Sequence, residues 1–242
     1  KHVQSLLDHW RGEGLSVATM KNRMAHLRWW AEKVGKQNVI PRTNDELELG
    51  RRKYVTNQTK ARDLPDVALS KIKDERLRIS LELQKAFGLR REECLKFQPF
   101  YALDGKQAHD AKNIRLAPAW CKGGRAREVP IKTEYQREVL QKALALAGKG
   151  SMIPADKKYV QQLGRYEQDT RRAGLSKLHG LRHQYAQNRY RELTGWDAPA
   201  CGGATRKELG EEQLQLDLEA RLTISNELGH NREAITSVYL GR

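Results

Sequence analysis

The sequence predicts a mainly α-helical protein with one small antiparallel β-sheet, an α+β fold. Apolar residues recur at three- and four-residue steps over most of its 242 residues, as they do along amphipathic helices. Near the middle of the chain, two short extended runs flank a Gly-Gly pair, which is typical of a hairpin. A basic stretch at 51–62 has little apolar periodicity and divides the chain into a small N-terminal part and a larger C-terminal part.

Residues 1–50 are predicted to form a helical domain. The run "VQSLLDHW" is typical of a short helix, and a second helix is expected from about Ser16 to Val34. The other face of this second helix is basic, and Lys21 and Arg28 on it are candidate contacts to a polyanionic partner, with ordinary solvation as the open alternative. The stripe expected to be buried consists of Val17, Met20, Met24, Leu27, Trp30, Ala31 and Val34.

The stretch 51–62, "RRKYVTNQTKAR", carries five positive charges and no negative charge. We interpret it as a basic interdomain linker whose cations contact phosphates rather than only water. The candidate contacts in it are Arg51, Arg52, Lys53 and Lys60.

Residues 63–242 are expected to form the second domain. After Pro65, one helix is predicted through residues 66–87, and Gly88 supplies its left-handed stop. A second short helix, "REECLKF", follows at once.

A β-hairpin is predicted from "NIRLAPAW" and "REVPI", joined by "CKGGRA". Gly123 and Gly124 provide the positive φ angles of its turn, and Lys122 lies at its lip. Pro118 and Pro130 indicate edge strands and a small sheet.

Helices are predicted to resume at 133–147, at 156–173 and through "SKLHGLRHQYAQNRYR", residues 176–191. Residues 195–210 contain four glycines and a proline, so we expect a surface loop there. A long helix then runs to about Leu228, and a last short helix starts near Asn231, a good N-cap residue.

Charge and cysteine content narrow the class of protein. The chain has 45 Lys and Arg against 30 Asp and Glu, a net charge of +15, which favours nucleic acid as partner over an incidentally basic protein. Three widely spaced cysteines without a C-x-x-C pair indicate reduced intracellular thiols rather than a disulfide framework. No apolar run reaches membrane-spanning length and no signal peptide opens the chain. Because the first residue is Lys1 and not Met, we expect a fragment or a processed chain.

The segment "HGLRH" has three ionisable side chains within five residues. His179, Arg182 and His183 stand at i, i+3 and i+4, so their side chains share one helix face. Two histidines four residues apart can bind zinc, but Gly180 replaces the glutamate of the metalloprotease motif, and Arg182 repels a cation. We therefore expect no metal site. A structural helix with one core histidine and solvated arginines remains the alternative for this stretch considered alone.

Four segments together resemble the tyrosine recombinase, or phage integrase, family. They are "FGLRREE" with Arg90, "CKGGRAREVPI" with Lys122, "HGLRH", and "LGHNREAITSVYLG", in which His230 stands nine residues before Tyr239. Glu93 fits the acidic position of the first segment. The resemblance implies a core DNA-binding domain at 1–50, the linker at 51–62 and a catalytic domain at 63–242.

The resemblance also implies roles for these residues. Arg90 and Arg182 are expected to bind the nonbridging oxygens of the scissile phosphate, and Tyr239 to attack the phosphorus. Lys122 is the expected general acid for the leaving 5′ oxygen. His179 is the expected proton acceptor and His230 the hydrogen-bond donor to phosphate, and these two roles are interchangeable.

The remaining candidate site residues are secondary. Arg125 and Arg127 flank the hairpin lysine and are candidate phosphate contacts, whereas His183 is a structural residue or a lesser member of the site. Family members commonly carry a tail beyond the tyrosine, and the chain stops three residues after Tyr239. We therefore expect a mobile tyrosine segment and a slack site without DNA. The role of the long stretch 195–228 is open between partner contacts and DNA clamping.

The expected reaction is site-specific cleavage and rejoining of DNA through a 3′-phosphotyrosine, without cofactor, metal or ATP, for integration or excision of a mobile element. The partners expected are double-stranded DNA bearing a specific site and three further copies of the chain, which forms a tetramer on DNA and a monomer in solution. Accessory DNA-bending proteins are possible partners, a membrane is not, and the expected location is the cytoplasm at the bacterial nucleoid. The alternatives are a non-cleaving DNA-binding regulator on the same fold and a type IB topoisomerase.

Overall fold

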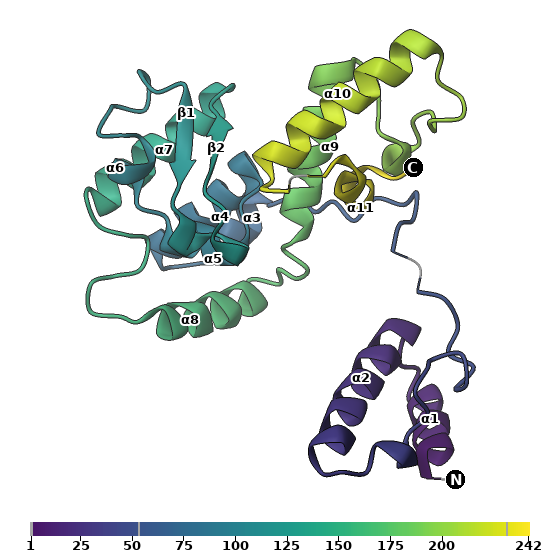
Figure 1. The fold of residues 1–242 in the computed structure, drawn as a ribbon. Helices are drawn as coiled ribbons and strands as arrows, with labels where there is room; N and C mark the ends of the chain where they lie inside the picture. The colour runs from purple at the N-terminus through teal and green to yellow at the C-terminus, as the bar shows by residue number, and fades with distance from the viewer. Residues whose placement is uncertain (1, 53, 231) are drawn as a thin grey trace. The chain divides into compact units, whose positions relative to one another are not determined.

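The computed structural model describes residues 2–52, 54–230 and 232–242. Its contacts group the chain into two compact units, Lys1–Tyr54 and Val55–Arg242 (Figure 1). Helices dominate both units, and the second unit also holds a two-stranded antiparallel sheet. The predicted fold class, mainly α with a small antiparallel sheet, is confirmed. Within the described residues, no helix is long and apolar enough to cross a membrane.

The first unit is built on α1 (His2–Gly12) and α2 (Val17–Lys33). Ser16 caps the N-terminus of α2 by accepting a hydrogen bond from the amide of Thr19, so the helix starts at Val17, one residue after the predicted start. A short 3₁₀ turn follows at Gln37–Val39. The buried side chains of this unit are Leu7, Trp10, Met20, Met24, Ala31, Leu47 and Leu49.

The apolar stripe predicted for this helix is wrong at two positions. Trp30 and Val34 are 59% and 46% exposed, because the predicted stripe is wider than the area that the unit's small core can cover. Arg28 is half-buried, and its guanidinium donates hydrogen bonds to the carbonyl oxygens of Pro41 and Thr43 and to Asn44 Oδ1, so its contact with DNA stays a prediction. These three bonds tie α2 to the chain that follows it.

In the second unit, the helix predicted at 66–87 is two helices. Asp74 accepts a hydrogen bond from the amide of Leu77 and so starts a new helix after a turn. Gly88, with φ of 60°, ends that helix in the left-handed conformation, as predicted. The first helices of this unit are α3 (Asp66–Leu69), α4 (Glu75–Phe87), α5 (Arg91–Lys96) and α6 (Pro99–Ala102).

The predicted hairpin is present. Strands β1 (Asn113–Leu116) and β2 (Arg127–Pro130) pair antiparallel, with Ile114 opposite Val129. Gly123 and Gly124 have the expected positive φ angles, 73° and 68°, inside a 3₁₀ turn that also contains Lys122. The connection between the strands therefore contains two 3₁₀ turns, Pro118–Trp120 and Lys122–Gly124, in place of one tight turn.

The remaining helices are α7 (Glu134–Ala147), α8 (Tyr159–Arg172), α9 (Gly180–Thr194), α10 (Glu211–Glu227) and α11 (Ser237–Leu240). The predicted start near Asn231 lies outside the described residues, and a 3₁₀ turn at Glu233–Thr236 precedes α11. The loop at 195–210 is not wholly a surface loop, because Ala198, Pro199 and Ala200 are buried. This short buried turn packs against α11.

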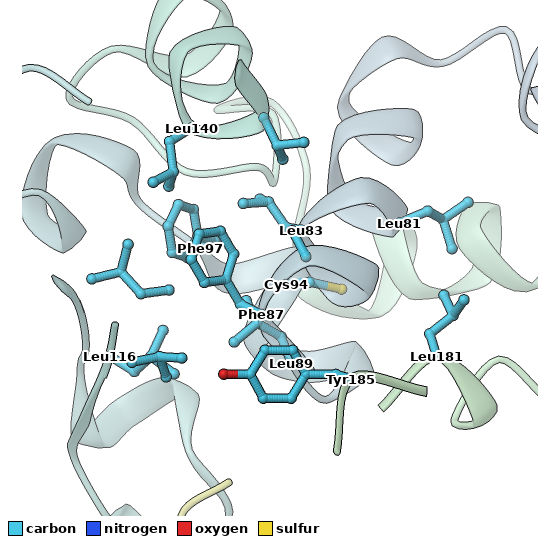
Figure 2. Close-up of a cluster of buried hydrophobic side chains, with 14 of the residues drawn as sticks. Leu81, Leu83, Phe87, Leu89, Cys94, Phe97, Leu116, Leu140, Leu181 and Tyr185 are labelled. Carbon is cyan, nitrogen blue, oxygen red and sulfur yellow. The ribbon is translucent and has the colours of Figure 1, made fainter. Parts of the chain in front are cut away.

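The core of the second unit surrounds α4 (Figure 2). Helix α4 packs against both α7 and α9, and its buried residues include Leu81, Leu83 and Phe87. Tyr185 of α9 presses so closely on Gly88 that a Cβ there would lie 2.7 Å from its ring. This packing brings the chain that leaves α4 at Gly88 directly against α9, and so Arg90 close to Arg182.

Candidate active site

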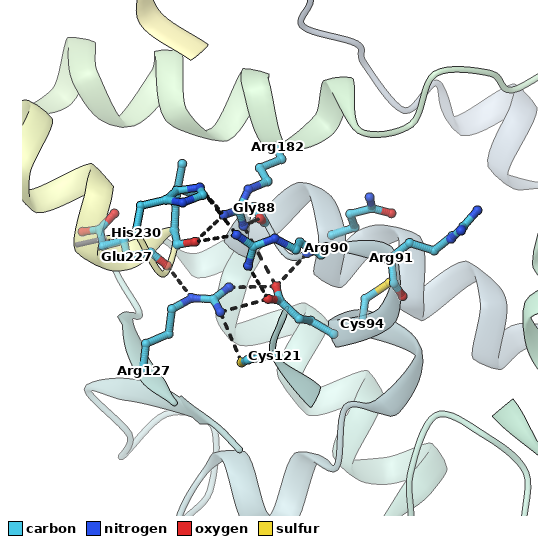
Figure 3. A network of polar contacts seen from close by, with 12 residues as sticks. Gly88, Arg90, Arg91, Cys94, Cys121, Arg127, Arg182, Glu227 and His230 are labelled. Carbon is cyan, nitrogen blue, oxygen red and sulfur yellow. Dashed lines mark hydrogen bonds and ion pairs between the residues drawn. The ribbon is translucent and has the colours of Figure 1, made fainter. Parts of the chain in front are cut away.

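Arg90, which immediately precedes α5, and Arg182, on α9, are far apart in sequence but converge on one carbonyl group (Figure 3). Nη2 of Arg90 lies 3.4 Å from the carbonyl oxygen of Leu228, and Nη2 of Arg182 also donates to that oxygen. Nη1 of Arg182 donates to the Gly88 carbonyl oxygen at 2.6 Å. Arg182 is fully buried, so its guanidinium is held in place by protein groups alone.

His230 and Tyr239 complete this cluster. Nε of Arg182 donates to the phenol oxygen of Tyr239 at 3.2 Å, and Nε2 of His230 lies 3.4 Å from the same oxygen. His230 Nε2 is also 3.5 Å from Nη2 of both Arg90 and Arg182. The phenol of Tyr239, two guanidinium groups and one imidazole therefore meet at a single point.

His179 and His183 also lie near the Tyr239 ring. His179 precedes the first residue of α9, and its ring centroid is 6.2 Å from that of Tyr239. The ring of His183 is closer, at 4.8 Å, and is 5.6 Å from the ring of His179. Nδ1 of His183 is buried without a hydrogen-bond partner in the described part of the chain.

The site keeps its histidines neutral at pH 7. Burial and the charges of Arg182 and Arg90 lower the pKa of His230 to about 4. Burial, reinforced by the charge of Arg182, also lowers the pKa of His179. Burial and neighbouring cations bring the pKa of His183 to about 4. A neutral imidazole retains a lone pair, so each of these rings is able to accept a proton.

Glu93 anchors the guanidinium groups. Its carboxylate accepts hydrogen bonds from Nη1 and the backbone amide of Arg90, both at 2.7 Å, and from both Nη atoms of Arg127. Burial opposes its ionisation, but the hydrogen bonds and charge of Arg127 and the charge of Arg182 outweigh burial, so the pKa of Glu93 falls to about 2. Three guanidinium groups against one carboxylate leave the cluster net positive, as an anion-binding site requires.

Arg127 belongs to this internal network, and its interpretation as a DNA contact is wrong. Its side chain is 5% exposed and donates to Glu93, to the Glu227 carbonyl oxygen at 2.8 Å and to Cys121 Sγ at 3.3 Å. Strand alternation was the signal that could have found this, because Arg127 shares a strand face with the buried Val129.

Lys122 stays apart from the cluster. It is exposed and, in the described part of the chain, makes no hydrogen bond or ion pair. Arg125 is exposed in the same way. The structure therefore brings together five of the six residues proposed from sequence and leaves the hairpin lysine free in solvent.

The cations of the linker are also solvent-facing. Arg51, Arg52 and Lys60 are exposed, and the guanidinium of Arg52 lies over the ring of Tyr54 at 4.9 Å. Lys21 is half-buried. Lys53 lies outside the described residues. No group of three or more histidine, cysteine or acidic side chains with metal-binding geometry occurs among the residues that the structure describes.

The tyrosine segment differs from the slack one expected. Tyr239 is only 5% exposed and its hydroxyl is hydrogen-bonded, while Leu240 beside it is fully buried. Helix α11 packs against α9 and against the buried turn at 199–201. Sequence reasoning missed these partners because α11 has only four residues, too few to show an apolar period.

Comparisons with known proteins show the family of this chain. A family model described as integrase matches residues 50–188, and one described as phage integrase, N-terminal, matches residues 1–40. A search of curated proteins found no match. Among solved structures, the integrase from mycobacterium phage Brujita is 16% identical with a TM-score of 0.38, over 99% of this chain and 83% of that one. With more than half of its length matched by the integrase model, the chain belongs to the integrase family of phage-type tyrosine recombinases.

Proposed function

We propose that this integrase-family chain is a site-specific DNA recombinase that cleaves and rejoins DNA through a 3′-phosphotyrosine on Tyr239, for integration or excision of a mobile element. One observation carries the proposal. The Tyr239 phenol oxygen lies 3.2 Å from Arg182 Nε and 3.4 Å from His230 Nε2, and Arg90 contacts the same imidazole. A nucleophile and its charge-stabilising groups are thus already assembled.

The proposed step is an in-line substitution at the scissile phosphorus. The Tyr239 oxygen forms a bond to phosphorus while the bond from phosphorus to the 5′ oxygen breaks, which leaves a 3′-phosphotyrosine and a free 5′ hydroxyl. Neutral His179 takes the phenol proton, and Lys122 supplies the proton for the departing oxygen. Attack by a 5′ hydroxyl of another strand reverses the step without ATP, because one phosphodiester is exchanged for another.

Arg90 and Arg182 stabilise the charge that grows on the nonbridging oxygens. The long contacts of Arg90 Nη2, 3.4 Å to Leu228 O and 3.5 Å to His230, are ones that a phosphate oxygen can replace with shorter bonds. Glu93 holds the rest of the Arg90 guanidinium, so the fork does not need to reorganise when phosphate enters. His230 donates a hydrogen bond to the same phosphate, or exchanges roles with His179.

Each part of the chain has its own proposed role in the complex with DNA. We assign residues 1–50 to core DNA binding, 51–62 to a basic linker and 63–242 to catalysis. Backbone phosphates are proposed to be contacted by the exposed cations Arg51, Arg52, Lys60 and Arg125 together with Lys21. Four copies act on two duplexes of specific sequence, each copy being a monomer before it binds DNA, with accessory bending proteins as further partners.

A nicked suicide duplex that contains the attachment site tests the proposal. The native protein is expected to form a covalent 3′ adduct that resists SDS, and Tyr239→Phe is expected to abolish the adduct while duplex binding survives. Binding without any adduct in the native protein contradicts the proposal and indicates a non-cleaving regulator. Adducts on duplexes of any sequence, together with relaxation of supercoiled DNA, indicate a topoisomerase.

A further inference from the structure

The backbone that follows the tyrosine is held from three sides. Nε2 of Gln187, on α9, donates to the carbonyl oxygen of Tyr239 at 3.0 Å. Nη1 of the buried Arg221, on α10, donates to the carbonyl oxygen of Gly241 at 3.0 Å. Asn57 pairs with the backbone of Arg242 in both directions, at 2.8 Å to its carbonyl oxygen and 2.9 Å from its amide. The backbones of Tyr239, Gly241 and Arg242 are thereby tied to three different parts of the unit.

Asn57 belongs to a strap, residues 57–62, that contains neither helix nor strand. Oγ1 of Thr59 in the strap donates to Oε1 of Gln187 at 2.9 Å. Gln187 therefore links the strap to the carbonyl of Tyr239 through its two amide atoms. The amide of Arg62 closes the strap by donating to the carbonyl oxygen of Gly180 at 3.1 Å.

Close packing fixes the position of the strap relative to α9 and to the segment after Tyr239. A Cβ at Gly180, the residue after His179, would lie 2.4 Å from the Arg62 side chain, so the strap lies directly on the start of α9. A Cβ at Gly241 would lie 2.8 Å from Oδ1 of Asn57 and 2.8 Å from the backbone of Ala200. Gly241 also has φ of 82°, so glycine is favoured there on two grounds.

We propose that Asn57, Thr59 and Gln187 are positioning residues for Tyr239, and that the strap thereby seats the nucleophile in the active site of its own protomer. The inference rests on the proposed role of Tyr239 as nucleophile. None of the three side chains reaches the phenol, the arginines or a histidine of the site through a hydrogen bond among the described residues. They act through the backbone, by keeping the four-residue α11 and its hydroxyl in line with Arg182.

Hydrogen exchange tests the hold of the strap without any need for activity. Asn57→Ala removes both hydrogen bonds to Arg242, and the Arg242 amide is expected to exchange about tenfold faster than in the native protein. Thr59→Val, which lacks the hydroxyl, is expected to accelerate exchange in 237–242, whereas Thr59→Ser is expected to retain the native rate. The matched control is Gln58→Ala, because Gln58 is exposed and makes no hydrogen bond among the described residues.

Cleavage of a nicked duplex at saturating concentration tests the positioning. Asn57→Ala and Thr59→Val are expected to form the covalent adduct about five- to tenfold more slowly, with duplex affinity within twofold of native, because the seated fraction falls and the DNA surface is intact. Gln58→Ala and Thr59→Ser are expected to react at the native rate.

Native exchange and native adduct rates in Asn57→Ala overturn the inference, and so does faster exchange with an unchanged adduct rate. A failure of the native protein itself to form an adduct contradicts the proposed function instead. In that case, the exchange rates still decide whether the strap holds the tyrosine segment.

Discussion

Nε of Arg182 donates a hydrogen bond to the phenol oxygen of Tyr239 at 3.2 Å, across 57 residues of sequence. The donor lies on a fully buried side chain whose other two nitrogens are bound to the carbonyl oxygens of Gly88 and Leu228. The guanidinium is therefore fixed before any substrate arrives, and it defines where the phenol oxygen lies. Electrostatic preorganisation of this kind is where enzymes obtain much of their rate.

Arg182→Lys is expected to slow adduct formation by about 10²- to 10³-fold, because a lysine offers one point charge in place of three fixed donors. Single-turnover cleavage of a nicked duplex measures the effect. Arg172→Ala, which removes a side chain that is 70% exposed, is the matched control for loss of a positive charge. An equal loss in both variants contradicts the role given to Arg182.

Glu93→Gln is expected to slow cleavage and to change how stability depends on pH. The pKa of Glu93 is about 2 in the folded chain, below its ordinary value of 4.5, so its charge stabilises the fold above pH 4.5. That contribution, on the order of 3 kcal/mol, is lost as the pH falls from about 4.5 to about 2. Urea unfolding across this range is expected to show a steeper loss in the native protein than in Glu93→Gln.

The cleavage rate is expected to be flat from pH 7 to pH 8. Burial and the nearby arginines lower the pKa of His179 from its ordinary 6.5 and that of His230 to about 4, so both are mainly neutral in this range. The rate should fall at lower pH, as the accepting histidine becomes protonated, because a protonated imidazole cannot accept the phenol proton. A single-turnover rate profile measures this, and an inflection near pH 6.5 contradicts the predicted neutral state.

Arg127→Ala is expected to unfold the protein more easily, by about 3 to 5 kcal/mol, because it leaves the buried Glu93 carboxylate without its main partner. Arg125→Ala is the matched comparison and is expected to leave the melting temperature unchanged, since Arg125 is exposed. Its expected effect is weaker duplex binding, with a salt dependence shallower by about one ion. Melting curves and binding at several salt concentrations separate the two arginines.

Lys122→Ala is expected to slow adduct formation by about 10²- to 10⁴-fold, the usual contribution of a general acid. The melting temperature should stay at the native value because the lysine is exposed on the hairpin turn. Lys122→Arg is expected to rescue little, since a guanidinium does not release its proton at neutral pH. A native cleavage rate in Lys122→Ala removes this residue from the mechanism.

Local sequence patterns were sufficient to predict most of the helices and the hairpin. The apolar period of α7 and α10 and the Gly123-Gly124 pair specify these elements through interactions within a few residues, and the structure confirms them. The break between α3 and α4 was missed although Asp74 is a capping residue, because the helical pattern continues on both sides of it. The exposure of Trp30 could not be predicted, since it depends on how much partner surface the small first unit offers.

The sequence by itself determined which chemical groups the protein has and their order along the chain: two arginines, a hairpin lysine, three histidines and a tyrosine. Only the tertiary structure decided which of them meet. Arg125 and Arg127 are two residues apart with identical chemistry, yet one faces solvent and the other is clamped to Glu93. The physical reason is that hydrogen bonds and burial act over a few ångströms in space, and packing of α4 against α9, not sequence spacing, sets those distances.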